Sequence, residues 1–249
     1  MTRRKILITG ASSGLGAGMA REFARRGRDV ALCARRVDNL EQLRTELLAA
    51  HPGITVAVRG LNVDEHDAIP EVFAALRDEL GGLDRVIVNA GLGKGAPIGS
   101  GRADANIATA TTNLVSALAQ AEAALQIFRE QNSGHLVLIS SMSAVRGLPG
   151  KKAAYAASKA GLTALGEGLA TEFRNSPIAV TTVQPGFIAT DMAARAGDAT
   201  LVVPLERGVA SMVAAIEHET VRACVPQWPW RAVNLVMPLL PRTLVARLS

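Results

Sequence analysis

A tyrosine and a lysine four residues apart are the side chains best suited to acid–base chemistry in this chain. Tyr155 is the only tyrosine among 249 residues, and Lys159 follows it in the stretch "YAASK". A spacing of four places both side chains on one face of a helix. A phenol with a pKa near 10 is a poor acid at neutral pH, but an ammonium about 4 Å away can lower that pKa by up to ~3 units where water is excluded. Alone, the pair is weak evidence, because an exposed helical pairing has the same spacing.

A glycine-rich turn near the N-terminus has the composition of a pyrophosphate-binding loop. "TGASSGLG" places Gly10, Gly14 and Gly16 directly after the apolar stretch "KILI". Because glycine lacks Cβ, backbone N–H groups and a helix N-terminus can approach phosphate oxygens closely. The spacing is GxxxGxG rather than GxGxxG, and a tight strand-to-helix turn would use the same glycines. Its position after the first strand of a βαβ unit favours a dinucleotide site.

The elements that must position these groups alternate between short apolar runs and longer amphipathic stretches. The runs lack polar alternation, which is typical of parallel strands buried on both faces. The sequence predicts strands at 5–10, 30–34, 55–60, 85–91, 135–141, 178–186 and 222–227, and helices at 14–27, 37–50, 65–80, 103–131, 152–175 and 206–218. We therefore expect one α/β domain over residues 1–249, a doubly wound parallel sheet in a three-layer α/β/α Rossmann-type fold, with 227–249 as an apolar tail of the same domain.

Composition argues against several functional classes. No run of 18 apolar residues occurs and no signal-peptide core follows "MTRRK", so we expect a cytoplasmic protein without a transmembrane segment. The four histidines are scattered and the two cysteines form no CxxC, so no metal site is predicted. The net charge of +5 is spread along the chain rather than massed in a stripe, so we do not expect a nucleic-acid partner.

Four motifs follow one another in the order of a known family. They are "TGASSGLG", "NAG" at 89–91, "YAASK" and "PGFIATDM" at 185–192. In this order and over this length, the chain resembles the short-chain dehydrogenase/reductase family across roughly residues 4–226. The resemblance implies a nicotinamide-dependent oxidoreductase that acts on a small-molecule carbonyl or alcohol substrate.

The resemblance also assigns roles to the acid–base residues. In the family the tyrosine exchanges a proton with the substrate oxygen, the lysine lowers the tyrosine pKa and holds the nicotinamide ribose, and a serine on the preceding strand steadies the substrate oxygen. Carried over, these are Tyr155, Lys159 and Ser141. Ser141 lies one residue farther from the tyrosine than is commonest, so Ser140 and Ser143 remain alternatives.

Further residues are implied around the cofactor and the proton path. Asn113 matches an asparagine that holds a water of the family's proton relay, and its alternative is a surface amide of the helix 103–131. After "PG", the backbone at Ile188 and the hydroxyl of Thr190 would hold the nicotinamide carboxamide. Besides Tyr155 and Lys159, the expected cofactor-binding residues are Gly10, Ser12, Ser13, Gly14, Leu15, Gly16, Arg35, Arg36, Asn62, Val63, Asn89, Ala90, Gly91, Pro185, Gly186, Ile188 and Thr190.

The end of the second strand indicates which nicotinamide cofactor binds. An NAD-dependent protein usually places an acid there for the ribose 2′-hydroxyl, but here Ala34 is followed by Arg35 and Arg36. Guanidinium groups can bind a 2′-phosphate with charge-assisted hydrogen bonds, so we predict NADP(H) with Arg35 as the primary contact. The alternative is a solvated arginine pair. Asn62 stands where the family usually has an aspartate near the adenine, and its amide oxygen can still accept a hydrogen bond.

The substrate and the tail are less well defined by the sequence. The loops 92–102, 144–153 and 187–205 would wall the pocket, with Leu148 and Met192 as apolar candidates. Both tryptophans lie in the tail, which either packs on its own domain or a partner subunit, or covers an apolar substrate or a membrane surface.

The interpretation that follows is a reversible NADPH-dependent carbonyl reductase that forms a homodimer or homotetramer through 103–131 and 152–175. The alternative is a non-catalytic dinucleotide-binding sensor or scaffold, which would not need the intact Ser141, Tyr155 and Lys159 set. A sugar-nucleotide epimerase is disfavoured because no C-terminal substrate domain is apparent.

Overall fold

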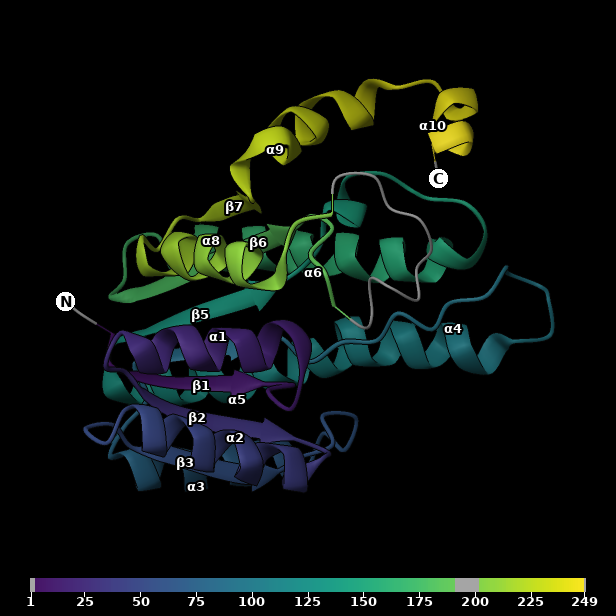
Figure 1. The fold of residues 1–249 in the computed structure, drawn as a ribbon. Helices are drawn as coiled ribbons and strands as arrows, with labels where there is room; N and C mark the ends of the chain where they lie inside the picture. Colours follow the sequence, from purple (N-terminus) through teal and green to yellow (C-terminus); the bar gives the residue numbers. More distant parts are fainter. Residues whose placement is uncertain (1–2, 191–201, 249) are drawn as a thin grey trace.

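The computed structural model describes residues 3–190 and 202–248, with side chains described as far as residue 245. Within these ranges, seven parallel strands form one sheet in the order β3-β2-β1-β4-β5-β6-β7 (Figure 1). The strands are β1 Lys5–Thr9, β2 Asp29–Ala34, β3 Val56–Gly60, β4 Arg85–Val88, β5 Gly134–Ile139, β6 Ile178–Pro185 and β7 Arg222–Val225. The helices are α1 Gly14–Arg25, α2 Val37–Ala50, α3 Ala68–Leu80, α4 Ala103–Ala110, α5 Ser116–Gln131, α6 Ala153–Glu172, α8 Leu205–Glu217, α9 Gln227–Val236 and α10 Arg242–Leu248.

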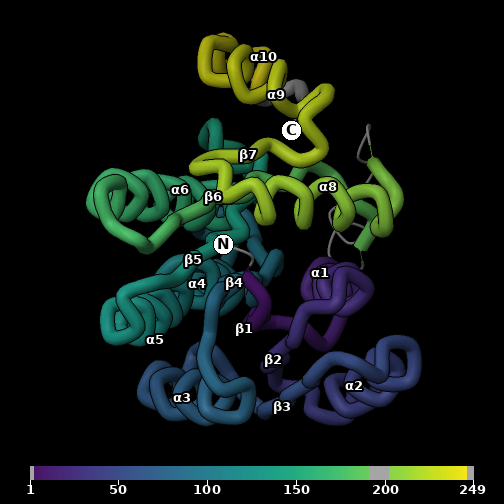
Figure 2. The backbone as a smooth tube through the Cα atoms, turned by 90° about the vertical axis from the view of Figure 1, so that its left-hand side faces the viewer, coloured from purple at the N-terminus to yellow at the C-terminus, as the bar shows by residue number. Residues whose placement is uncertain are grey.

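Helices cover both faces of the sheet. Figure 2 shows α1, α2 and α8 on one side and α3, α5 and α6 on the other. Each side has its own apolar core, with Phe23, Leu40 and Met212 in the first and Phe73 and Phe128 in the second. The predicted doubly wound α/β/α fold is confirmed.

The sheet changes winding direction at its centre. β1 pairs with β2 on one side and with β4 on the other, in parallel register Ile6 with Val30 and Ile6 with Arg85. The loops that follow β1 and β4 therefore diverge at the carboxyl edge, where open α/β sheets bind their ligands.

Two segments differ from the predicted elements. The expected continuous helix 103–131 is interrupted by a π turn over Thr111–Val115, which separates α4 from α5. Asp64 accepts hydrogen bonds from Thr112 (2.9 Å) and Ser116 (2.8 Å), so a loop side chain holds both sides of this turn. The tail forms α9, a short 3₁₀ turn Met237–Leu239 and α10, which lie beyond β7, apart from the sheet layers in both views (Figures 1 and 2).

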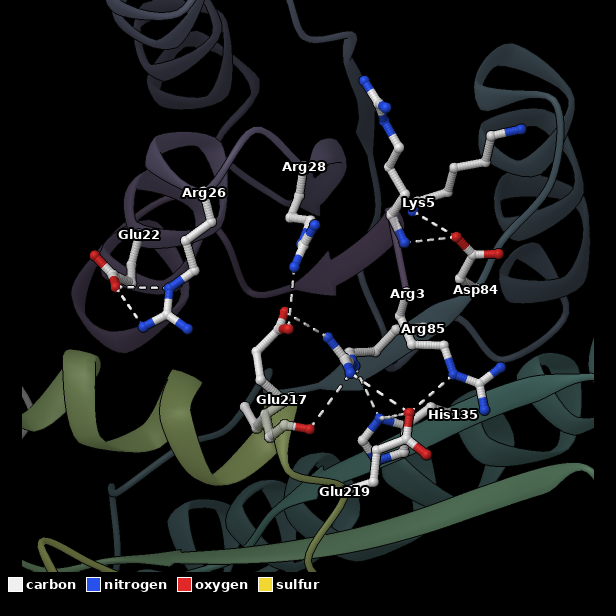
Figure 3. A network of polar contacts seen from close by, with 12 residues as sticks. Arg3, Lys5, Glu22, Arg26, Arg28, Asp84, Arg85, His135, Glu217 and Glu219 are labelled. Carbon is white, nitrogen blue, oxygen red and sulfur yellow. Dashed lines mark hydrogen bonds and ion pairs between the residues drawn. The ribbon is translucent and has the colours of Figure 1, made fainter. Parts of the chain in front are cut away.

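A polar network fills the amino edge of the sheet (Figure 3). Arg85 of β4 is 1% exposed and donates to His135 Nδ1 (2.8 Å), Glu217 (3.1 Å) and the Ile216 carbonyl (3.3 Å). His135 Nε2 lies 2.8 Å from the Thr181 hydroxyl. Because Nδ1 accepts from arginine, the ring proton is on Nε2 and the imidazole is neutral, so its approach to Glu219 is not an ion pair.

Among the helices in the described ranges, none combines the length and the apolar character that a membrane span requires.

Candidate active site

Tyr155 and Lys159 lie one turn apart near the start of α6, facing the carboxyl ends of β4 and β5. Lys159 is buried, and its ammonium donates to the Ile139 carbonyl at the end of β5 (2.7 Å). The same nitrogen lies 3.7 Å from the position that a Cβ on Gly91 would occupy. Lys159 therefore lies between the ends of two neighbouring strands, one helical turn from Tyr155.

The three candidate serines have different surroundings. Ser141 lies close enough to the Tyr155 side chain to affect its pKa, and its hydroxyl accepts from the Ser143 backbone N–H (3.1 Å). Ser140 is buried, and its hydroxyl donates to the Lys159 carbonyl (2.9 Å) and lies 2.7 Å from the Thr163 hydroxyl. Since the Ser140 hydroxyl is already bonded to α6, the geometry favours Ser141 as the group beside the tyrosine.

Burial dominates the electrostatics of the pair. It raises the pKa of Tyr155, and the nearby Ser141 hydroxyl only partly opposes this rise. Burial also lowers the pKa of Lys159 to about 8. Desolvation therefore dominates the Tyr155 pKa in this structure, and the lowering by the lysine, expected with a bound nicotinamide, stays a prediction. A raised pKa keeps the phenol protonated at neutral pH, ready to donate.

Asn113 is fully buried in the π turn and is not a surface amide. Its side chain accepts from the Leu92 N–H (2.7 Å) and donates to the Leu92 carbonyl (2.9 Å) and toward Ser158 (3.3 Å). The amide thus fixes the loop after β4 beside the lysine. The sequence contained no signal for the π turn itself.

The glycine turn is packed against the end of β4. Gly10 has a φ of +64°, and a Cβ there would lie 2.8 Å from the Ala90 Cα. A Cβ on Gly16 would lie 2.4 Å from the Gly10 carbonyl. Asn89 braces the turn from the other side by donating to the Thr9 carbonyl (2.9 Å). Gly10 and Gly16 are therefore required for the close approach of two backbone segments, and the turn leads directly into the N-terminus of α1.

The two arginines after β2 point to different places. Arg36 reaches over the glycine turn and donates to the hydroxyls of Ser12 (3.1 Å) and Ser13 (2.6 Å). Arg35 is exposed, and no hydrogen bond or ion pair joins it to other described residues. Arg36, rather than the predicted Arg35, is the guanidinium that the fold brings to the turn.

The remaining predicted cofactor residues line the same edge. Asn62 donates to Glu65 (3.1 Å) in the loop after β3, and Val63 beside it is buried. After β6, Ile188 is buried and pairs with Val203 in a short parallel bridge. The Thr190 methyl lies 3.7 Å from the position of a Cβ on Gly14, so the segment after "PG" reaches the glycine turn. Met192, the apolar candidate of the next loop, lies outside the described residues.

A pocket of about 200 Å³ opens beside Ser141 and Tyr155. It is lined by Leu15, Gly93, Gly95, Ser140, Ser141, Met142, Ser143, Leu148, Lys151, Lys152, Tyr155, Pro185, Gly186, Phe187, Ile188, Thr190 and Trp230. Trp230 comes from the tail, and sequence reasoning did not place it here; the only signal was that both tryptophans lie in that segment. A wider hollow of about 360 Å³, bordered by Arg3 and Phe173, contains none of the predicted site residues.

Comparisons with known proteins agree with this geometry. The family described as short chain dehydrogenase matches residues 4–200. An uncharacterised oxidoreductase of Mycobacterium tuberculosis is 56% identical over 249 residues, covering 100% of this chain and 98% of the relative. Human dehydrogenase/reductase SDR family member 11 is 35% identical over 201 residues, covering 78% and 77% of the two chains.

Solved structures show the same fold. Levodione reductase superimposes with a TM-score of 0.81 at 25% identity, covering 90% of this chain and 96% of its own. NADPH-dependent 3-quinuclidinone reductase from Rhodotorula rubra gives a TM-score of 0.78 at 28% identity, covering 90% of each chain. The chain belongs to the short-chain dehydrogenase/reductase family, and the family defines it as an oxidoreductase that uses a nicotinamide cofactor.

Proposed function

We propose that this protein is an NADPH-dependent reductase that converts a ketone or aldehyde to an alcohol, reversibly, with Tyr155 as the acid. The observation that carries the proposal is that Ser141 and Tyr155 line the same pocket, one helical turn from a buried lysine. A non-catalytic binding module has no need of an acid in such a place.

The residues present fit a dinucleotide. The close contact of Gly10 with Ala90 leaves no room for side chains where the backbone turns into α1, and N–H groups at a helix start favour phosphate. Arg36 with Ser12 and Ser13 would hold the 2′-phosphate, and Lys159 the nicotinamide ribose. NADPH supplies the hydride when bound.

The protein's own part in the reaction is the proton and the position of the oxygen. Ser141 would donate a hydrogen bond to the substrate carbonyl oxygen and Tyr155 would transfer its proton to that oxygen as the alcohol forms. The raised pKa of Tyr155 suits this direction, since the phenol enters the step protonated. Lys159 stabilises the phenolate left behind and is one turn away on α6.

Cofactor choice is tested by binding. We expect NADPH to bind at least tenfold more tightly than NADH in a calorimetric titration, and Arg36→Ala to remove that preference while NADH binding stays the same. Arg35→Ala is the matched control for loss of a neighbouring positive charge. Equal binding of both cofactors by the unaltered protein would refute the choice of NADP(H).

The role of Tyr155 in catalysis is tested by removing its hydroxyl. We expect Tyr155→Phe to lower the rate of NADPH oxidation with a ketone substrate by about 10³-fold while cofactor binding is retained. Turnover that is unchanged in Tyr155→Phe would refute the acid role. Cofactor binding without turnover of any ketone, aldehyde or alcohol would favour the sensor alternative.

A homodimer or homotetramer is proposed through the helices that carry the site. The surface of α4, the π turn and α5 exposes Ile107 (65%), Val115 (48%) and Leu118 (42%), an apolar stripe that a second copy would cover. Sedimentation should give at least twice the mass of 26.0 kDa, and Leu118→Asp should shift it toward the single chain. A monomer at micromolar concentration would refute this assembly.

A further inference from the structure

The tail buries two of its described side chains, Trp230 and Val245, and Trp230 lies in the pocket. Trp230 is 6% exposed, whereas Trp228, two residues earlier on α9, is 78% exposed. The indole meets the Phe187 ring edge to face, with centroids 5.4 Å apart at 72°. Both rings line the same cavity as Ser141 and Tyr155. The tail therefore forms part of the pocket wall.

The backbone of the wall is shaped around the indole. A Cβ on Gly186 would lie 2.1 Å from both Cε2 and Nε1 of Trp230, so only glycine permits the ring to lie against this strand end. The glycine of "PG" thus has a local role in seating the tryptophan. Nε1 is buried without a hydrogen-bond partner among the described residues, and it lies on the side of the ring that faces Gly186.

The tail is fixed on both sides of the pocket. Asn234 of α9 donates to Gln184 of β6 (3.0 Å), and the same oxygen accepts from Arg222 of β7 (2.8 Å). From the loop after β5, the Arg146 guanidinium donates to the Pro238 carbonyl and to the Leu240 carbonyl (3.0 Å). Arg146, a residue that could otherwise attract an anion, instead joins the serine-bearing loop to the tail.

We propose that Trp230 is a specificity-determining residue and that the substrate is a carbonyl compound with an apolar group larger than ethyl on one side. This rests on the proposed function for the carbonyl, since Ser141 and Tyr155 hold its oxygen. Met142, Leu148 and Phe187 extend the apolar surface beside Trp230, and burying such a group contributes roughly 0.8 kcal/mol per CH₂. Small carbonyl compounds would leave this surface uncovered.

A binding measurement tests the wall without any hydride transfer. The chain has two tryptophans, and Trp228→Phe removes the exposed one, so that Trp230 alone gives the tryptophan emission. Titrating this variant with octan-2-ol should give a saturable change in emission at a concentration at least tenfold below that needed for butan-2-ol. No saturable response to octan-2-ol would overturn the proposal.

Kinetics then separate a substrate contact from a merely structural cover. With octan-2-one, Trp230→Ala should raise KM at least tenfold with little change in kcat, while kcat/KM for butan-2-one changes less than twofold. Trp230→Phe keeps an apolar ring and should retain octan-2-one activity within threefold, and it serves if the alanine variant does not fold. Trp228→Ala is the control and should leave the kinetic constants for both ketones unchanged.

The outcomes distinguish this inference from the proposed function. Equal losses on both ketones would assign Trp230 to stability and overturn the inference, while ketone reduction itself would stand. A Trp230 response to octan-2-ol in a protein that oxidises or reduces nothing would support the apolar wall and refute the reductase.

Discussion

The two edges of the sheet both bury charged groups, but they use them differently. At the amino edge, Arg85 donates from all three guanidinium nitrogens to protein acceptors, and His135 is bonded at both ring nitrogens (Figure 3). At the carboxyl edge, the Lys159 ammonium has three donors, and within the described residues one of them meets an acceptor, the Ile139 carbonyl.

The arginine near the glycine turn shows the same contrast. Arg36 bonds only to serine hydroxyls, and no carboxylate of the described residues pairs with it, whereas Arg28 and Arg85 both contact Glu217. Charges that hold the fold are matched within the chain. At the site, Lys159 and Arg36 have N–H donors without a protein acceptor among the described residues. Such donors would be needed to bind a cofactor and a substrate oxygen.

The largest expected effect is a loss of unfolding free energy when the network at the amino edge is broken. Arg85→Met keeps most of the side-chain volume but removes the donors of Glu217 and His135, and breaking a buried pair costs about 3 to 5 kcal/mol of unfolding free energy. Urea denaturation measures this loss. The matched control is Arg59→Met, whose half-exposed pair with Glu79 should contribute under about 1 kcal/mol. Similar losses for both would mean that the network is not a cooperative unit.

The next effect is an acid sensitivity set by His135. Burial lowers its pKa from 6.5 to about 2, so below pH 6.5 the unfolded chain binds a proton that the folded chain does not. Stability from this group is therefore complete above pH 6.5 and falls as the pH drops, by about 2.5 kcal/mol at pH 4.5. His135→Gln should flatten that part of the curve in urea melts between pH 7 and 4.5. An unchanged slope would contradict the assignment of a neutral, buried ring.

The amino edge also shows where sequence reasoning stops. The alternation of apolar runs predicted the sheet and its helices, because burial on both faces leaves a continuous apolar signal in each strand. His135 stood among four scattered histidines, and nothing local relates it to Arg85, which lies 50 residues earlier. Such a network depends on strand order, which the spacing of residues does not encode.

At the carboxyl edge, some relations between residues could be read from the sequence and others depend on tertiary structure. Tyr155 and Lys159 are linked by helix geometry alone, so their relation was readable in the sequence. Arg35 and Arg36 are adjacent, and only the direction in which the chain leaves β2 decides which one reaches Ser13. Trp230 reaches the pocket through tertiary packing of a segment without a strand or motif, so its place required the structure.

The third prediction concerns the folding stability that is lost by burying the charge of Lys159. Since burial lowers the pKa of Lys159 to about 8, its charge destabilises the fold below pH 8, and this penalty disappears as the pH rises toward 10.5. Lys159→Met should therefore raise the unfolding free energy at pH 7 by about 2 kcal/mol, the desolvation gain less one lost hydrogen bond, while abolishing activity. Lys5→Met is the control, because its ammonium bonds the Gly81 carbonyl at the same 2.7 Å but in an exposed place. A gain for Lys5→Met, or none for Lys159→Met, would contradict a penalty specific to the site.

The smallest effect separates two adjacent serines at the boundary between fold and site. The Ser140 hydroxyl bonds the Lys159 carbonyl and Thr163 within α6, so Ser140→Ala should cost about 1 kcal/mol in thermal or urea unfolding and leave Tyr155-dependent turnover within twofold. Ser141→Ala should cost a similar free energy through loss of its bond from the Ser143 N–H, but it should also reduce turnover by about 10²-fold, because its hydroxyl lies beside Tyr155 in the pocket. Loss of turnover in Ser140→Ala with an unchanged Ser141→Ala would exchange their roles. It would also place the residue that acts in catalysis one position earlier in the loop after β5.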